Sequence, residues 1–111
     1  MDTLNEYRSI IEKVLRNYVN ITYANGKIEN EIIIDHNNDR YLVMSLGWEN
    51  VRRIHGCIIH IDIIDGMVWI QRDGTEDGIA TELEQEGMPK DHIVLGFHEP
   101  DVRCHTGYAV A

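Results

Sequence analysis

The side chains best suited to chemistry in this sequence are one histidine and three acids near the middle of the chain: His60, Asp62, Asp73 and Glu76. An imidazole beside carboxylates can act as a general base, and such a set could serve a small metal-dependent hydrolase or nuclease. The same four side chains could instead form a hydrogen-bonded patch that fixes a hairpin to a helix. Both alternatives are open from the sequence. We expect the second, with no enzymatic activity and no cofactor.

Motifs elsewhere in the sequence do not strengthen the catalytic alternative. A nuclease centre of the restriction-enzyme type needs an acid two residues before a lysine, and none of the three lysines has one. The sequence has no phosphate-binding loop, nucleophile elbow or zinc-protease motif. Cys57 and Cys104 lie far apart without a CxxC pair, and the six histidines lack the spacing of a metal site. We therefore expect no metal.

The charge balance bears on nucleic-acid binding. Nineteen acidic and ten basic residues give a formal net charge of −9. Because this charge repels the phosphate backbone, strong direct binding to nucleic acid is disfavoured. One candidate for a direct DNA-binding face remains, formed by Arg52 and Arg53 with Arg40 nearby. The alternative is that these arginines are solvated charges at strand ends.

One small fold must position these residues, because 111 residues suit a single domain, 1–111, with one core. The segment Thr3-Leu4-Asn5-Glu6 has the form of a capping box and predicts a helix start. Apolar residues then recur at helical spacing, which predicts a helix packed on a sheet through one face: Tyr7, Ile10, Ile11, Val14, Leu15 and Tyr18.

Four later stretches have the composition of strands: 28–35, 40–48, 51–65 and 67–72. The polar tetrad 36–39 predicts the first turn, and Gly56 predicts a bulge or bend in the third stretch. Asp65-Gly66 predicts a type I′ hairpin, which fixes the register. The predicted pairs are Ile64 with Met67, Ile63 with Val68, Asp62 with Trp69, Ile61 with Ile70, and His60 with Gln71.

This register gives the hairpin two different faces. One face is predicted to be core and carries Ile59, Ile61, Ile63, Val68 and Ile70. The other places an indole and two aliphatics among polar groups, a mixture typical of protein interfaces: His60, Asp62, Ile64, Met67, Trp69, Gln71 and, beyond the strand, Asp73. The alternative is that the second helix of the chain covers this face.

From these faces we predict a partner-binding surface. Its residues are Trp69, His60, Asp62, Gln71 and Asp73. The apolar ending of the chain, with Tyr108 and Val110, is a second candidate contact because such an ending usually packs against something.

The remaining elements complete an α+β fold. Thr75 is predicted to cap a second helix, with Ile79, Ala80 and Leu83 on one side and Gly87 and Pro89 after its end. The run 93–97 predicts a short buried strand or connector. The expected architecture is a curved antiparallel meander of about four strands, with the N-terminal helix on one face and the second helix after the hairpin. A homodimer formed through an exposed strand edge is an open alternative.

Composition also indicates a compartment. The first residues are acidic rather than basic, and no segment approaches the ~20 apolar residues of a membrane span. We expect a cytoplasmic, soluble protein without a membrane association.

Several segments together resemble the XisI family. They are HGCIIHIDIIDG at 55–66, WIQRDGTEDGIA at 69–80 and IVLGF at 93–97, with LNEYR at 4–8 and the ending YAVA at 108–111. The likeness extends over essentially the whole chain, and the second run is specific.

The resemblance implies a cyanobacterial factor that controls excision of the fdxN DNA element, a rearrangement during heterocyst differentiation. Strand exchange in that system belongs to a separate site-specific recombinase. A second accessory protein, XisH, is similar to endonuclease-like proteins. The implied role is therefore a non-enzymatic factor that binds an XisH-like protein and supports the recombinase indirectly. The family has no catalytic residues to carry over to this sequence.

Overall fold

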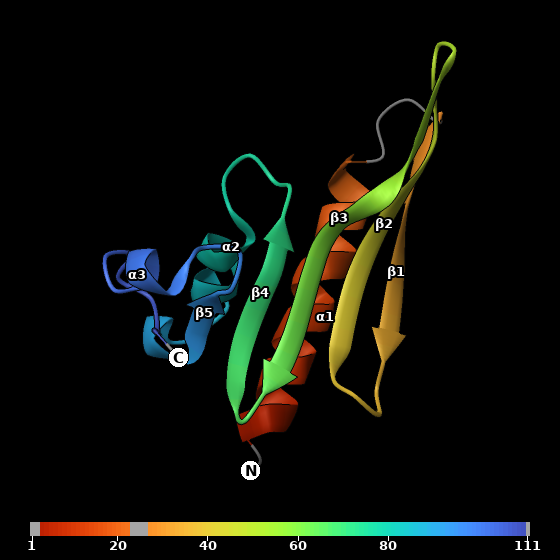
Figure 1. The fold of residues 1–111 in the computed structure, drawn as a ribbon. Coiled ribbons are helices and arrows are strands. Elements are labelled where there is room, and N and C mark those ends of the chain that lie inside the picture. The colour runs from red at the N-terminus through yellow and green to blue at the C-terminus, as the bar shows by residue number, and fades with distance from the viewer. Residues whose placement is uncertain (1–2, 23–26, 111) are drawn as a thin grey trace.

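The computed structural model describes residues 3–22 and 27–110 and shows an open sheet whose two longer helices pack on one face (Figure 1). Its helices are α1 (Thr3–Thr22), α2 (Ile79–Gln85) and α3 (Pro100–Arg103), with a 3-10 turn at Lys90–His92. Its strands are β1 (Ile28–Asp35), β2 (Arg40–Glu49), β3 (Arg52–Ile64), β4 (Met67–Asp73) and β5 (Ile93–Leu95).

The strands lie side by side in sequence order. Strands β1 to β4 form an antiparallel meander, and β5 joins β4 in parallel. The predicted α+β fold is therefore confirmed, and a short fifth strand completes the sheet. Among the described residues, no helix has both the length and the apolarity needed to span a bilayer.

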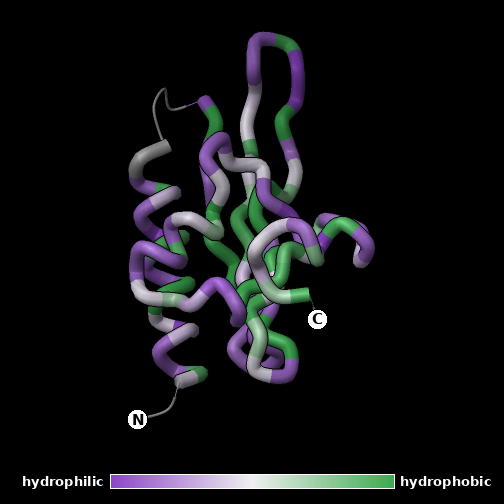
Figure 2. Tube along the Cα trace, turned by 90° about the vertical axis from the view of Figure 1, so that its left-hand side faces the viewer, coloured by the Kyte–Doolittle hydropathy of each residue, from purple (hydrophilic) through white to green (hydrophobic). Residues whose placement is uncertain are grey.

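Helix α1 packs on the sheet through its predicted apolar stripe. Tyr7, Ile11, Val14 and Leu15 are all 4% exposed or less, and the hydrophobic residues gather between this helix and the strands (Figure 2). Fully burying one such side chain stabilises a fold by about 1.5–3 kcal/mol. This stripe therefore anchors the helix and makes one face of the sheet the core.

The Asp65-Gly66 turn has the predicted geometry. Both residues have positive φ, 50° and 78°, as a type I′ turn requires. The register is confirmed for the four pairs nearest the turn, from Ile64 with Met67 to Ile61 with Ile70. The five predicted core residues of the hairpin are buried: Ile59, Ile61, Ile63, Val68 and Ile70.

The fifth predicted pair is wrong because β4 contains a bulge. His60 pairs with Arg72, and Gln71 is the additional residue. An additional residue shifts the alternation of all residues beyond it, so Asp73 pairs with the buried Ile59 and lies on the helix-covered face. The predicted bulge at Gly56 is displaced as well, since the register between β2 and β3 shifts at Ile58.

Helix α2 begins at Ile79, three residues later than a cap at Thr75 predicts. Asp73 Oδ2 accepts the backbone N–H of Ile79 at 2.8 Å, and Thr75 Oγ1 accepts that of Gly78 at 3.2 Å. These carboxylate and hydroxyl groups thus hold the loop before the helix, and Thr75 does not cap the helix itself.

Helix α2 also packs on the same face of the sheet as α1. Its predicted apolar residues Ile79, Ala80 and Leu83 are buried in the core that includes Ile11 and Ile61. The helix forms the crossover between the parallel strands β4 and β5, which must pass over one face. The alternative that α2 covers the Trp69 face is therefore wrong.

Candidate functional site

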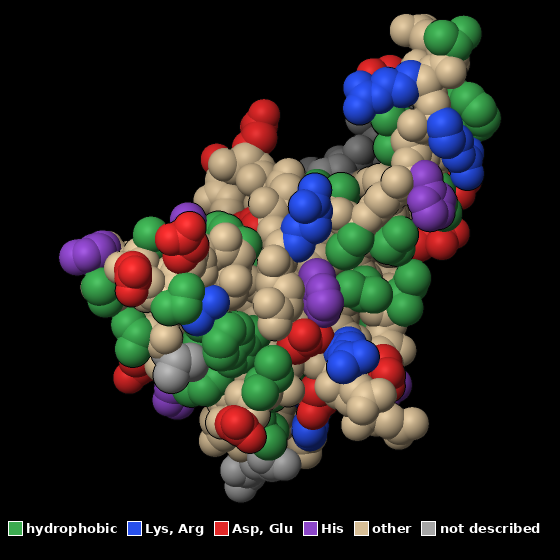
Figure 3. Space-filling view, in the orientation of Figure 1, with side chains coloured by type: hydrophobic (Ala, Val, Ile, Leu, Met, Phe, Trp, Pro, Cys, Tyr) green, Lys and Arg blue, Asp and Glu red, His purple; other side chains and the backbone are tan. Residues whose placement is uncertain are grey.

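The candidate site lies on the face of the sheet that α1 and α2 leave uncovered, and Figure 3 looks onto this face. Asp62 pairs with Trp69, so both side chains project to this face, and His60 and Gln71 contact Asp62 there. Asp62 is buried, whereas the other three side chains are half-buried. The structure thus brings four of the predicted partner-binding residues together, and we call these four residues the Trp69 site.

Trp69 is held by the segment that follows β5. The Arg103 guanidinium carbon lies 5.0 Å from the ring centre, within the range of a cation–π contact. Arg103 is itself fixed, since it donates to the carbonyls of His98 at 3.0 Å and Gly96 at 3.4 Å. A Cβ on Gly96 would lie only 3.0 Å from Trp69 Cε3. The indole is therefore presented in a fixed orientation.

Asp62 is the centre of a polar network beside the indole. Its Oδ1 lies 3.0 Å from His60 Nε2 and 3.9 Å from Arg40 Nε, and its Oδ2 accepts Gln71 Nε2 at 3.4 Å. A buried carboxylate needs such partners because an unpaired one is costly to desolvate. The network thus gives the buried carboxylate partners from β2, β3 and β4. Its arginine was absent from the predicted site because Arg40 comes from β2.

The four residues of the catalytic alternative are not brought together. His60 and Asp62 lie on the open face, whereas Asp73 is on the other face, with its Oδ1 accepting the N–H of Thr75 at 2.9 Å. Glu76 follows in the same loop and lines a cleft between α1 and α2. A general base and its carboxylate partners must act on one substrate, and the sheet separates these two pairs. Within 3–22 and 27–110, no three His, Cys, Asp or Glu residues are grouped to hold a metal ion.

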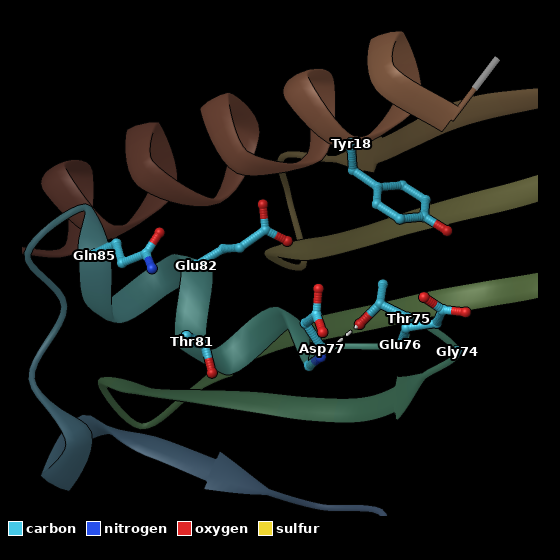
Figure 4. Close-up of a pocket in the computed structure, with 9 residues that line it drawn as sticks. Tyr18, Gly74, Thr75, Glu76, Asp77, Thr81, Glu82 and Gln85 are labelled. Carbon is cyan, nitrogen blue, oxygen red and sulfur yellow. Dashed lines mark hydrogen bonds between the residues drawn. The ribbon is translucent and has the colours of Figure 1, made fainter. Parts of the chain in front are cut away.

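The cleft that contains Glu76 has a volume of about 570 Å³. Tyr18 from α1 lies opposite loop 74–78, and Glu82 reaches into the cleft from α2 (Figure 4). Burial, with the nearby charges of Asp73 and Asp77, raises the pKa of Glu82 above its ordinary value. The cleft is acidic, so it disfavours phosphate and other anions as ligands.

The three arginines of the DNA-binding alternative do not form one basic face. Arg40 begins β2, whereas Arg52 and Arg53 of β3 pair with the last two residues of β2, roughly 30 Å away at ~3.4 Å per residue. Arg40 faces the buried carboxylate of Asp62, and Arg52 Nη1 lies 3.9 Å from Glu49 Oε1. Their positive charges are thus separated and partly neutralised.

The C-terminal candidate contacts lie apart from the Trp69 site. Ala109 donates its N–H to Ile93 at 2.8 Å and pairs with Val94, which places the ending along β5. Tyr108 packs against the core and donates its hydroxyl to Glu84 of α2. Val110 is 56% exposed. The ending is therefore packed at Tyr108 and open at Val110.

Comparisons with known proteins agree with this fold. A family model described as XisI protein matches residues 1–110. A crystal structure of a XisI-like protein from Anabaena variabilis is 37% identical, has a TM-score of 0.89, and aligns over 98% of this chain and 100% of that chain. The crystal structure of the fdxN element excision controlling factor XisI from the same organism is 32% identical with a TM-score of 0.81, over 99% and 100% of the two chains. No curated protein matches the chain.

Proposed function

The chain belongs to the XisI family, and we propose that it is a non-enzymatic accessory factor that controls excision of a DNA element by binding a partner protein. Its relative of 32% identity is described as an fdxN element excision controlling factor. The observation that carries the proposal is the Trp69 site, in which an indole in contact with Arg103 lies on a face of the sheet that α1 and α2 leave open.

The composition of this site favours a protein as the ligand. Tryptophan and arginine are the residues that most often dominate the energy of protein interfaces, and Trp69 is stacked beside Arg103. The neighbouring carboxylate of Asp62 already has its hydrogen-bond partners. Binding would therefore bury this surface without leaving that charge unpaired. The entropy cost of fixing these side chains on binding would be small, because they already contact one another.

The proposed partner is an XisH-like protein, as the family resemblance implies. A chain with a net charge of −9 would associate rapidly with a basic, DNA-handling surface. The recombinase would then be influenced through this partner rather than by direct contact. The exposed Val110 is a secondary contact in this proposal.

Co-purification from cells that express an XisH-like protein tests this function. Tagged wild type should retain the partner, and a variant with Trp69→Ala and without the last four residues should lose it. The matched control is Trp48→Ala, which removes the other tryptophan of the chain, 52% exposed near the far end of β2. Equal retention of the partner by all three proteins would refute the assigned surface.

Assays of the purified protein separate this function from its two alternatives. We expect no DNA cleavage with Mg²⁺ or Mn²⁺ and no duplex binding at low salt, because neither the four-residue catalytic set nor a continuous basic face is assembled. Metal-dependent cleavage that disappears in His60→Ala would establish an enzyme instead. DNA binding that weakens steeply with salt and requires Arg53 would establish a DNA-binding module.

A further inference from the structure

The open face carries a second apolar surface on β1 and β2, which borders the Trp69 site where Leu42 pairs with His60. Ile33 of β1 and three residues of β2, which are Leu42, Met44 and Leu46, project outward at consecutive outward positions. Ile33 is 46% exposed and the other three are half-buried. We call these four residues the β2 row. Hydrophobic side chains gather accordingly over β1 to β3 in Figure 3, separate from those over β4 and β5.

This row departs from the usual pattern of a half-buried sheet. Residues that alternate with buried ones are normally polar when their face meets water. In β2 the inward Tyr41 and Val43 are fully buried, yet the outward Leu42 and Met44 are also apolar. Both helices α1 and α2 belong to the opposite face. An apolar row without a covering element is expected where another chain packs.

Charges flank the row asymmetrically. On the β1 side, Glu29 and Glu31 are exposed and share the face of Leu46 and Met44. On the β3 side, His55 lies directly across Leu46, and Arg53 is one outward position further along. The face therefore changes from acidic through apolar to basic across three strands.

We propose that a second copy of this chain packs on the β2 row, with the two open faces together and the two-fold axis parallel to β2. Such an axis exchanges the two sides of the row, so the acidic β1 of one copy lies over the basic β3 of the other. Glu29 would then face Arg53 and His55 of the second copy. A two-fold axis perpendicular to the strands would instead oppose β1 to β1, and acids would meet acids. Charge complementarity selects the first arrangement.

The geometry is that of two aligned sheets. Inner faces of this kind lie ~10 Å apart and their side chains interdigitate, with strand directions within about 30° of each other. Trp69 and Gln71 stay outside this interface, because β4 lies outside β3 whereas β1, the strand opposed to β3, is the edge of the second sheet. His60 and Asp62 belong to β3 and lie at the border of the interface. The dimer would leave the Trp69 indole of each copy accessible to a partner, and its existence does not depend on the identity of that partner.

Sedimentation velocity over a wide concentration range tests the proposal on the full chain without any partner. Wild type should sediment as a dimer and Met44→Glu as a monomer, and circular dichroism should show that the variant is folded. The control is Val51→Glu, at a residue that is 95% exposed on the β2-β3 turn, and it should remain a dimer. A monomeric wild type would overturn the proposal. So would a dimer that persists in Met44→Glu, which would point to pairing through a strand edge.

Charge reversal tests the orientation independently of apolar packing. Glu29→Arg with Glu31→Arg should weaken the dimer at least ~10-fold, because like charges then face each other across the interface. Arg53→Glu alone should also weaken it, and the three changes combined should restore most of the affinity. A triple variant that associates no more tightly than the double variant would exclude this two-fold axis.

Discussion

The guanidinium of Arg103 lies 5.0 Å from the ring centre of Trp69, although the two residues are 34 positions apart in sequence. This contact ties the C-terminal segment to β4 of the sheet. It places a planar cation against the one indole on this part of the open face. The orientation of the proposed binding residue therefore depends on a segment outside the β-meander.

Replacing Arg103 with alanine should loosen this segment. The change removes the cation–π contact and the hydrogen bonds to His98 and Gly96, which together should lower the free energy of unfolding by about 1–3 kcal/mol. Urea denaturation measures the loss. In a Trp48→Phe background, emission from Trp69 should also shift to the red. An unchanged emission maximum would show that Arg103 does not shield the indole.

Removing the carboxylate of Asp73 should affect the start of α2 and not the open face. Asp73→Ala deprives the N–H of Ile79 of its acceptor, and loss of a cap of this kind costs about 0.5–2 kcal/mol. Thermal or urea unfolding should detect this loss, while partner binding should be unchanged. If Asp73→Ala keeps its stability but loses the partner, Asp73 contributes to partner binding and not to the start of α2.

The acidic cleft predicts a pH-dependent gain in stability for Glu82→Gln. Burial and the charges of Asp73 and Asp77 raise the folded pKa of Glu82 above 4.5, so the folded state binds more protons than the unfolded state between the two values. The protonated form of Glu82 therefore stabilises the folded state below pH 4.5, and this stabilisation is lost as the pH rises through the folded pKa of Glu82. The variant should gain about 0.5 kcal/mol at pH 7 and nothing at pH 4. Glu76→Gln, at an exposed position of the same cleft, is the control, and an equal gain at both pH values would contradict this account.

A side chain at Gly47 should disrupt the edge of the sheet. An added Cβ would lie 2.1 Å from the carbonyl oxygen of Lys27 and 2.7 Å from Cα of Ile28, and both are backbone atoms. Gly47→Ala should therefore destabilise the protein by about 1–3 kcal/mol and increase hydrogen exchange in β1. Gly56→Ala is the matched control, because no atom lies within 4 Å of its added Cβ. Similar losses in both variants would contradict a local clash.

The parts of the fold that local sequence signals specify were predictable. Asp65-Gly66 requires a backbone that few other residue pairs adopt, so the turn, the register beside it and the two faces of the hairpin follow from the sequence. The buried stripe of α1 follows from helical spacing in the same way. His60, Asp62 and Trp69 were placed on one face because they lie close to that turn.

The features that depend on tertiary contacts were not predictable. The bulge at Gln71 is not marked by a Gly or a Pro at that position in the sequence. Because of this bulge, Asp73 lies on the helix-covered face and accepts the N–H of Ile79. Thr75 has the sequence position of a helix cap. The sequence does not show that the carboxylate of Asp73 bonds across the loop to the N–H of Ile79. Arg103 joined the site only through the fold of the C-terminal segment.

The affinity for an XisH-like protein, measured by calorimetric titration, tests the central claim most directly. Trp69→Ala should raise the Kd at least ~10-fold, which corresponds to about 1.4 kcal/mol or more for an interface anchor. Trp48→Ala should leave the Kd unchanged. A Kd that is the same for wild type and Trp69→Ala, or that rises only in Trp48→Ala, would contradict binding through the Trp69 site.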